Sequence, residues 1–358
     1  FKQIKFVSII FLLLFLGLLI AKTNEDFGYY HLPNSIQFAQ QKLQFGLGNI
    51  NHGFKHISTL FMLMSLNYLP FIDHYLFNLT NFLFLTFFIT FIIKEIFYRE
   101  EINLNISILI LSLTLVLFLS KFSRLAEYGS DIAGQIVILL YIFFIFEFFF
   151  NKNIEKDNLN YFKLSIILSL FAITLKFISA IYIILFIPFL FITNNKKQKI
   201  MSLININFLG FIFLSIFLFF FLNFSSTGCL IYPVETTCFY SQFEWALSSD
   251  VIKYLNLHYE VWSKGGLGPG FSIENKKEYL QNLNWVTNWI NVYFVGKFTD
   301  YILVILLIIF IYSIFFIKEF LSQKKNVSKK NINYLIFYTL FFILFFVWFL
   351  NFHTLRYA

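Results

Sequence analysis

Long apolar runs alternate along the chain with short polar segments, a pattern typical of a multi-pass membrane protein. A helix needs about 20 apolar residues to cross the hydrocarbon core of a bilayer. The chain has 358 residues, 59% of them hydrophobic and only 13% charged, whereas a soluble domain carries about 25% charged residues. The runs of suitable length are Ile4–Ala21, Tyr75–Ile93, Leu104–Ser120, Asp131–Phe149, Ser202–Leu222, Tyr301–Ile317 and Ile332–Leu350. The pattern predicts an all-α membrane protein folded as a polytopic helical bundle.

Two apolar stretches do not have the length of a single span. Leu164–Ile192 is too long and carries Lys176 near its middle, whereas Ile57–Phe71 is too short and contains Pro70. Loops rich in Lys and Arg stay in the cytoplasm. The basic clusters share one side only if Leu164–Ile192 enters and returns, as a hairpin with Lys176 near its outer tip. By the same parity Ile57–Phe71 does not cross, and is an interfacial or re-entrant helix. The total is about nine spans, with the N-terminus inside and Ala358 outside.

We expect three parts: a bundle with two catalytic outer loops (1–222), a large outer loop (223–300) and C-terminal membrane helices (301–358), which we expect to be truncated. The polar segments gather on the outer face, whereas the inner loops are short and basic. The net charge of +8 fits cytoplasmic anchoring. It is not accompanied by a basic stripe or motif of a nucleic-acid-binding protein, so no nucleic acid partner is expected.

The first outer loop begins with two adjacent carboxylates, Glu25 and Asp26. A partly desolvated carboxylate at the membrane boundary is a stronger base and suits removal of a proton from a hydroxyl. In the alternative interpretation, Asn24 caps a helix and both acids lie in its first turn. Further candidate substrate-loop residues follow: Tyr29, Tyr30, His31, His52 and His56. His52 and His56 have i, i+4 spacing, but the intervening Gly53 argues against a helix there. We therefore predict no metal site and leave a divalent-metal requirement open.

The second outer loop, "KFSRLAEYGSDIAGQ", carries Arg124 and Asp131. Asp131 opens the fourth span, so it is either a functional acid or a helix N-cap. Arg124 can pair with a phosphate or with Glu127. Lys176 is the sharpest single candidate, because a cation in the centre of a membrane helix costs about 2.5–3.5 kcal/mol and usually serves a function. It can reach a lipid phosphate, or simply extend to water.

Cys229 and Cys238 are the only cysteines, and both fall on the predicted outer face. Such a pair indicates a disulfide, which stabilises a loop of this length by about 3 kcal/mol. The large outer loop also contains the tryptophans Trp245, Trp262, Trp285 and Trp289. These rings could stack on sugars or anchor the chain at the membrane interface.

Several sequence blocks resemble known membrane proteins. "EDFGYYHLP", directly after the first span, resembles the acidic first-loop motif of polytopic GT-C-type glycosyltransferases. Together with "FGLGNINHGF", "RLAEYGSDIAGQ", "TLKFISA", "TGCLIYPVETTCF" and "TLRYA", it also resembles a largely uncharacterised group of bacterial multi-pass membrane proteins that is itself GT-C-like. The family pattern has two aspartates where this chain has Glu25 and Asp26, which leaves open which carboxylate reacts.

The resemblance implies inverting transfer of a sugar from a polyprenyl-phosphate-linked donor to a glycan or lipid acceptor. The reaction would take place at the outer (periplasmic or extracellular) face of the bacterial cytoplasmic membrane. It implies Glu25 or Asp26 as general base and Asp131 as the second-loop acid. The implied contacts to the donor phosphate are Lys176, Arg124 and Arg356. The partners would be membrane lipid, the lipid-linked donor and the acceptor, with no further cofactor assigned.

Other functions remain open. An O-antigen-type glycan polymerase or ligase would use the same face but rely on more arginines, and this chain has only Arg99, Arg124 and Arg356. A lipid-linked glycan transporter would need charged or interrupted helices at the bilayer midplane. A role as a structural membrane subunit would not explain why the polar residues are concentrated in the outer loops.

Overall fold

The computed structural model describes residues 2–19, 26–97, 111–112, 114–115, 128–150, 155–191, 205–268, 271–292, 294, 302, 306 and 331–351. These residues are mostly helical, which confirms the predicted all-α class. Within them, the one sheet pairs two short antiparallel strands, β1 (Leu267–Gly268) and β2 (Phe271–Ser272). The chain divides into two compact units, Phe1–Leu247 and Ser248–Ala358.

Among the described residues, three helical stretches are long and apolar enough to cross a membrane: His74–Glu95, Asp131–Phe149 and Ile206–Thr227. They correspond to η4 (His74–Leu76) with α5 (Leu79–Phe97), to α7 (Asp131–Phe150) and to α10 (Ile206–Thr227). Shorter apolar helices stand at four other predicted places: Lys5–Leu19, Asn160–Leu175, Phe177–Leu190 and Leu335–Asn351. The predicted spans Leu104–Ser120 and Tyr301–Ile317 lie largely outside the described residues, so the total of about nine spans stays a prediction.

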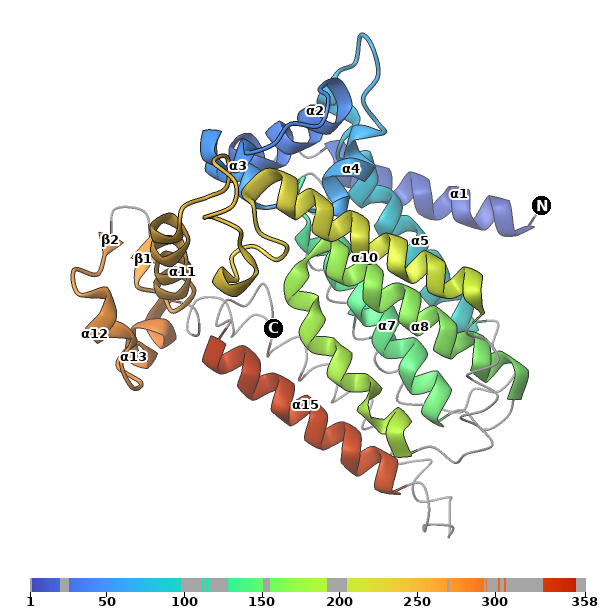
Figure 1. Cartoon of the computed structure of the whole chain (residues 1–358). Coiled ribbons are helices and arrows are strands. Elements are labelled where there is room, and N and C mark those ends of the chain that lie inside the picture. Colours follow the sequence, from blue (N-terminus) through green and yellow to red (C-terminus); the bar gives the residue numbers. More distant parts are fainter. Residues whose placement is uncertain are drawn as a thin grey trace. The chain divides into compact units, whose positions relative to one another are not determined.

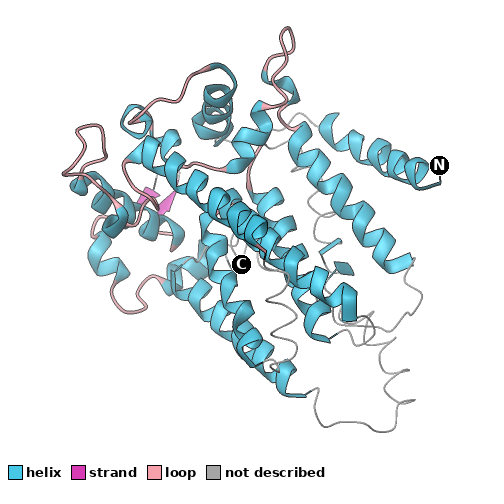
Figure 2. Cartoon of the chain, turned by 45° about the vertical axis from the view of Figure 1, so that its right-hand side comes forward, coloured by secondary structure: helices cyan, strands magenta, loops and turns pink. Residues whose placement is uncertain are grey.

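The first unit is a bundle in which neighbouring helices pack in sequence. α1 (Lys2–Phe15) and its extension η1 (Leu16–Leu19) lead toward α5; α5 packs against α7, and α7 lies along α8 (Glu155–Leu175) (Figures 1 and 2). The core between α5 and α7 contains Phe82, Phe88, Ile136 and Phe143, all nearly inaccessible to solvent. Buried apolar side chains therefore hold the helices of the bundle together. Other apolar side chains, such as Phe87, face outward.

The predicted hairpin is present. α8 ends at Leu175, Lys176 is not helical, and the 3-10 helix η6 (Phe177–Phe191) returns beside α8 and α7 (Figure 1). The Tyr141 hydroxyl on α7 donates to the carbonyl of Tyr182 at 2.9 Å and ties η6 to the bundle. Lys176 therefore stands at the tip of the hairpin, as predicted.

The polar segment before α5 folds into short helical pieces. In chain order they are the π-helix η2 (Phe27–His31), α2 (Leu32–Gln40), α3 (Leu47–Ile50), the 3-10 helix η3 (His52–Lys55) and α4 (Thr59–Ser65). Ser58 caps α4, because its hydroxyl accepts from the Leu60 amide. α4 is seven residues long, far too short to cross a bilayer, which confirms that this stretch does not form a span.

α10 begins later and ends later than the predicted span. Asn205 caps its start by accepting from the Phe208 amide, and Gly228 ends it at φ 78°, a left-handed conformation that glycine adopts without strain. Cys229 and Cys238 follow and form a disulfide with an S–S distance of 2.08 Å, which confirms the predicted pair. The disulfide-closed segment, with η7 (Glu235–Thr237), belongs to the first unit.

The second unit contains α11 (Ser249–Ser263), α12 (Lys276–Leu280), α13 (Val286–Trp289) and α15 (Asn331–Asn351), besides the two strands. Trp285, Trp289 and Trp348 form its buried aromatic core. The Lys264 ammonium lies 5.3 Å from the Trp285 ring centroid and 2.7 Å from a carboxylate oxygen of Glu260. Trp285 and Trp289 are thus packing residues, rather than sugar platforms or interface anchors.

Candidate functional site

The predicted residues Asp131 and Lys176 meet in an ion pair. Asp131 is the first residue of α7, where the helix dipole favours a negative charge. The Lys176 ammonium contacts its Oδ1 atom from the hairpin tip. The side chains of Asp131 and Lys176 are 25% and 23% exposed, respectively, so the pair is accessible and partly shielded from water. Two charges separated by 45 residues therefore mark one end of the bundle.

The hairpin tip also anchors the segment that carries His56. The Ser58 hydroxyl donates to the carbonyl of Leu175 at 2.7 Å, and the Thr59 hydroxyl donates to the carbonyl of Thr174 at 3.1 Å. These two bonds satisfy carbonyls at the end of α8, which have no partner within the helix. They fix the chain that follows His56 immediately beside Lys176.

The histidines of the two sequence blocks come together. His52 and His56 approach to 3.4 Å between their Nε2 atoms. The Tyr30 ring lies 4.2 Å from the ring of His31 and 5.6 Å from that of His56, between centroids. Tyr29 lies 5.8 Å from His52. We refer to His31, His52, His56, Lys176 and Asp131 as the His–Lys cluster.

Gly53 allows this convergence. A Cβ atom at this position would collide with the Tyr29 carbonyl oxygen and lie 2.7 Å from the Tyr30 Cβ. The Asn34 amide nitrogen, almost fully buried, donates to the carbonyls of both Tyr30 and Gly53, at 2.7 and 3.0 Å. Gly53 was expected to argue against a helix, but it lies within the short 3-10 helix η3. It is needed there for the close approach of two backbones.

The charges around His56 make its environment electropositive. Burial, and to a lesser extent the neighbouring groups, together lower the pKa of His56 to about 3; these neighbours are His52, Lys55, Lys176 and His31. His56 is therefore neutral at pH 7, and its ring can donate or accept a hydrogen bond without carrying charge. An anion bound here would oppose the positive charges and raise the pKa of His56.

The first-loop acids are only partly described. Asp26 stands at the start of η2, where its side chain makes no capping hydrogen bond. Its neighbour Phe27 packs against Tyr128 at 4.3 Å between ring centroids, so the first loop reaches the segment that leads into Asp131. Three predicted site residues, Glu25, Arg124 and Arg356, lie outside the described residues.

Two residues near the cluster were not among the predicted ones. Lys55 contributes positive charge beside His56, and Tyr232, from the disulfide-closed segment, lies 6.0 Å from the His56 ring. Lys55 could have been found from its place between two histidines. Tyr232 could not, because only the folding of the segment after α10 brings it there.

The composition of the cluster suits an anion better than a cation. In the part of the chain that the structure describes, no group of three or more His, Cys, Asp or Glu side chains is arranged to hold a metal ion. The lysine ammonium and the imidazole rings instead provide hydrogen-bond donors for phosphate oxygens. A phosphate at Lys176 would compete with Asp131 and release that carboxylate.

Comparison with known proteins gives a family but no activity. No curated protein and no solved structure matches the chain. One family model, described as a domain of unknown function (DUF8201), matches residues 1–358. Because the match extends over the whole sequence, the chain belongs to the DUF8201 family.

Proposed function

We propose that this chain is a membrane glycosyltransferase of the GT-C type. It transfers a sugar from a polyprenyl-phosphate-linked donor to a glycan or lipid acceptor of the cell envelope. The observation that carries the proposal is the partly shielded Lys176–Asp131 ion pair beside three histidines, at one end of a bundle of apolar helices. A lipid-linked phosphate needs such a site, with cations at the boundary and apolar helices below it.

The cluster lies on the outer face of the bacterial cytoplasmic membrane in this proposal. Lys94 is in the last turn of α5, and Lys156 lies near the start of α8, whereas Lys176 follows the end of α8. Basic residues favour the cytoplasmic side, so these positions support the opposite side for the cluster. The Cys229–Cys238 disulfide agrees with an oxidising compartment.

The reaction proceeds with inversion at the sugar. A carboxylate removes the proton of the acceptor hydroxyl, and the acceptor oxygen attacks the anomeric carbon. The bond from that carbon to the phosphate oxygen breaks, and its electron pair leaves with polyprenyl phosphate. Lys176 stabilises the charge that develops on this oxygen. Neutral His56 donates a hydrogen bond to the phosphate, while Arg124 and Arg356 are proposed as further phosphate contacts.

Glu25 or Asp26 acts as the base, since both belong to the first loop, which reaches the segment leading into Asp131. Asp131 holds Lys176 in place in the resting state. When the donor phosphate takes over Lys176, the Asp131 carboxylate becomes available close to the reacting groups. It is therefore the next candidate for the base.

Transfer of radiolabelled sugar from polyprenyl-phosphate donors in membranes tests the proposal. Lys176→Met should lower transfer on the order of 10²–10³-fold, the usual cost of losing one electrostatic contact to the leaving oxygen. Lys163→Met is the matched control, because Lys163 is on α8, the helix that ends directly before Lys176, and its ammonium lies 5.0 Å from the Phe208 ring centroid. Equal transfer by wild type and Lys176→Met at matched expression would contradict the proposed role.

The base is tested by the Glu25→Gln/Asp26→Asn double variant in the same assay. Loss of transfer assigns the base to the first loop, whereas full transfer moves it to Asp131. If wild type transfers no sugar from any polyprenyl-phosphate donor, the polymerase and transporter interpretations regain ground.

A further inference from the structure

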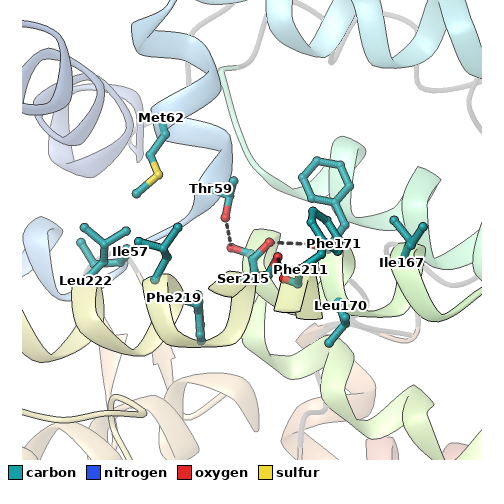
Figure 3. Close-up of a pocket in the computed structure, with 12 residues that line it drawn as sticks. Ile57, Thr59, Met62, Ile167, Leu170, Phe171, Phe211, Ser215, Phe219 and Leu222 are labelled. Carbon is teal, nitrogen blue, oxygen red and sulfur yellow. Dashed lines mark hydrogen bonds between the residues drawn. The ribbon is translucent and has the colours of Figure 1, made fainter. Parts of the chain in front are cut away.

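Two neighbouring cavities border the segment that carries His56, since Ile57 lines both of them. The first, of about 270 Å³, lies between α4, α8 and α10, and Figure 3 shows its lining residues around the crossing of these helices. The second, of about 320 Å³, lies between α2, the residues that follow it and the end of α10. Ile57, Met62 and Leu222 line both cavities, so the two are neighbours that share one wall.

The first cavity is apolar in its chemistry. Its lining is mostly Ile, Leu, Met and Phe and contains no ionisable side chain. The hydroxyl protons of Thr59, Thr174 and Ser215 are already donated to the carbonyls of Thr174, Phe171 and Phe211, respectively (Figure 3). α10 also exposes Phe211 and Leu218, on a helix apolar enough to face lipid. An alkyl chain fits this compartment.

The second cavity is lined by side-chain amides. Gln37, Gln41 and Gln44 contribute to it, together with Asn34. The amide nitrogen of Gln37 is buried and makes no hydrogen bond within the described residues. Leaving such a donor unpaired is costly, so a ligand that accepts from Gln37 would stabilise the site.

Hydroxyl groups match this lining better than phosphate does. The hydroxyls of Ser225 and Ser226 donate to backbone carbonyls and keep lone pairs that can accept from a ligand. Lys42 is the one ionisable residue among those that line the cavity, whereas phosphate sites usually gather several cations. The volume of the second cavity, about 320 Å³, falls near the lower limit for small-molecule sites. Phe38 and Phe54 provide apolar surface in it.

We infer that the paired cavities bind a neutral glycolipid, with its alkyl chain between α4, α8 and α10 and its sugar headgroup against Gln37. This site is distinct from the His–Lys cluster, because no residue of the cluster lines either cavity. That the glycolipid is the acceptor rests on the proposed function. The second cavity is near the His–Lys cluster along the chain, because Phe54, which lines it, lies between His52 and His56. The binding itself does not depend on any transfer activity.

Photo-crosslinking tests the inference on the full chain in phosphatidylcholine nanodiscs. The probes are an alkyl glucoside with a diazirine in its chain, the alcohol with the same chain, and the corresponding alkyl phosphate. We expect saturable labelling of α8 and α10 by the glucoside, with higher affinity than for the alcohol or the phosphate. Gln37→Met should weaken glucoside binding about fivefold and leave labelling by the alcohol unchanged.

Two matched controls separate the headgroup from the chain. Gln40→Met changes an exposed amide on the same helix that does not line the cavity and should have no effect. Ser215→Phe should block labelling by filling the apolar cavity, whereas Leu214→Phe, at a 54% exposed neighbour outside the lining, should not. Equal labelling by glucoside and alcohol, tighter binding of the phosphate, or insensitivity to Gln37→Met and Ser215→Phe would overturn the inference.

The outcome distinguishes this inference from the proposed function. Glucoside binding without any sugar transfer would support the glycolipid site and contradict the proposed transferase activity. Transfer that is unaffected by Gln37→Met and Ser215→Phe would show that the glycolipid site is not the acceptor site, and would still support the proposed transferase activity.

Discussion

Replacing Lys176 by Met removes the charge that faces Asp131 and keeps an unbranched side chain. An exposed ion pair contributes about 0.2–1 kcal/mol to stability, whereas breaking a buried pair costs about 3–5 kcal/mol. The side chains here are 23% and 25% exposed, so their interaction lies between these limits. Asp131 also keeps the favourable dipole of α7 when its partner is removed. We therefore expect a coupling free energy of about 1–2 kcal/mol.

A double-mutant cycle measures this coupling directly. Lys176→Met, Asp131→Asn and the double variant would be compared with wild type by thermal unfolding of the full chain in detergent, followed by circular dichroism. Lys163→Met is the control, and its effect should add to that of Asp131→Asn. If the effects of Lys176→Met and Asp131→Asn also add within about 0.5 kcal/mol, the two charges do not interact and the geometry of the cluster is wrong.

Three further predictions concern the surroundings of the cluster. The folded-state pKa of His56 is about 3, below its ordinary value near 6.5, so its contribution to stability is present above about pH 6.5 and is lost as the pH falls toward 3. Thermal unfolding should show up to about 2 kcal/mol of loss at about pH 5, and His56→Phe should reduce this slope; an unchanged slope would refute the assignment. Gly53→Ala should destabilise the chain by about 1–3 kcal/mol, because its Cβ would meet the Tyr29 carbonyl. Gly28→Ala, where a Cβ meets nothing within 4 Å, should not, and equal melting temperatures for the two would contradict the packing. Reducing the Cys229–Cys238 disulfide should cost about 2–3 kcal/mol in the same measurement, and no change in melting temperature would contradict this role.

The sequence was sufficient for features that depend on length and charge. The Leu164–Ile192 stretch is too long for one span, and the distribution of lysines required it to return, which placed Lys176 at a tip. The Cys229–Cys238 pair followed from its isolation on one face. The predicted span Asp131–Phe149 starts where the apolar run starts, and α7 begins at the same residue, Asp131.

Tertiary contacts decided what the sequence could not. The close approach of Gly53 to Tyr30 depends on the bonds of Asn34 to both backbones, and no local pattern encodes it. Trp285 looks like an interface anchor by residue type, but it is buried against Phe349 at 5.4 Å between ring centroids. The Gln37 cavity arises only when α2 meets the end of α10.

The central claim is that the His–Lys cluster binds the donor phosphate, and equilibrium binding of a short-chain polyprenyl phosphate to the nanodisc-embedded chain tests it most directly. Charged hydrogen bonds contribute about 1.5–3 kcal/mol each, so Lys176→Met should weaken binding about 10- to 100-fold, while Lys163→Met should bind as wild type does. In wild type, binding should also raise the pKa of His56, followed by NMR of labelled histidine. Equal affinity of wild type and Lys176→Met, with the His56 titration unmoved, would contradict the account.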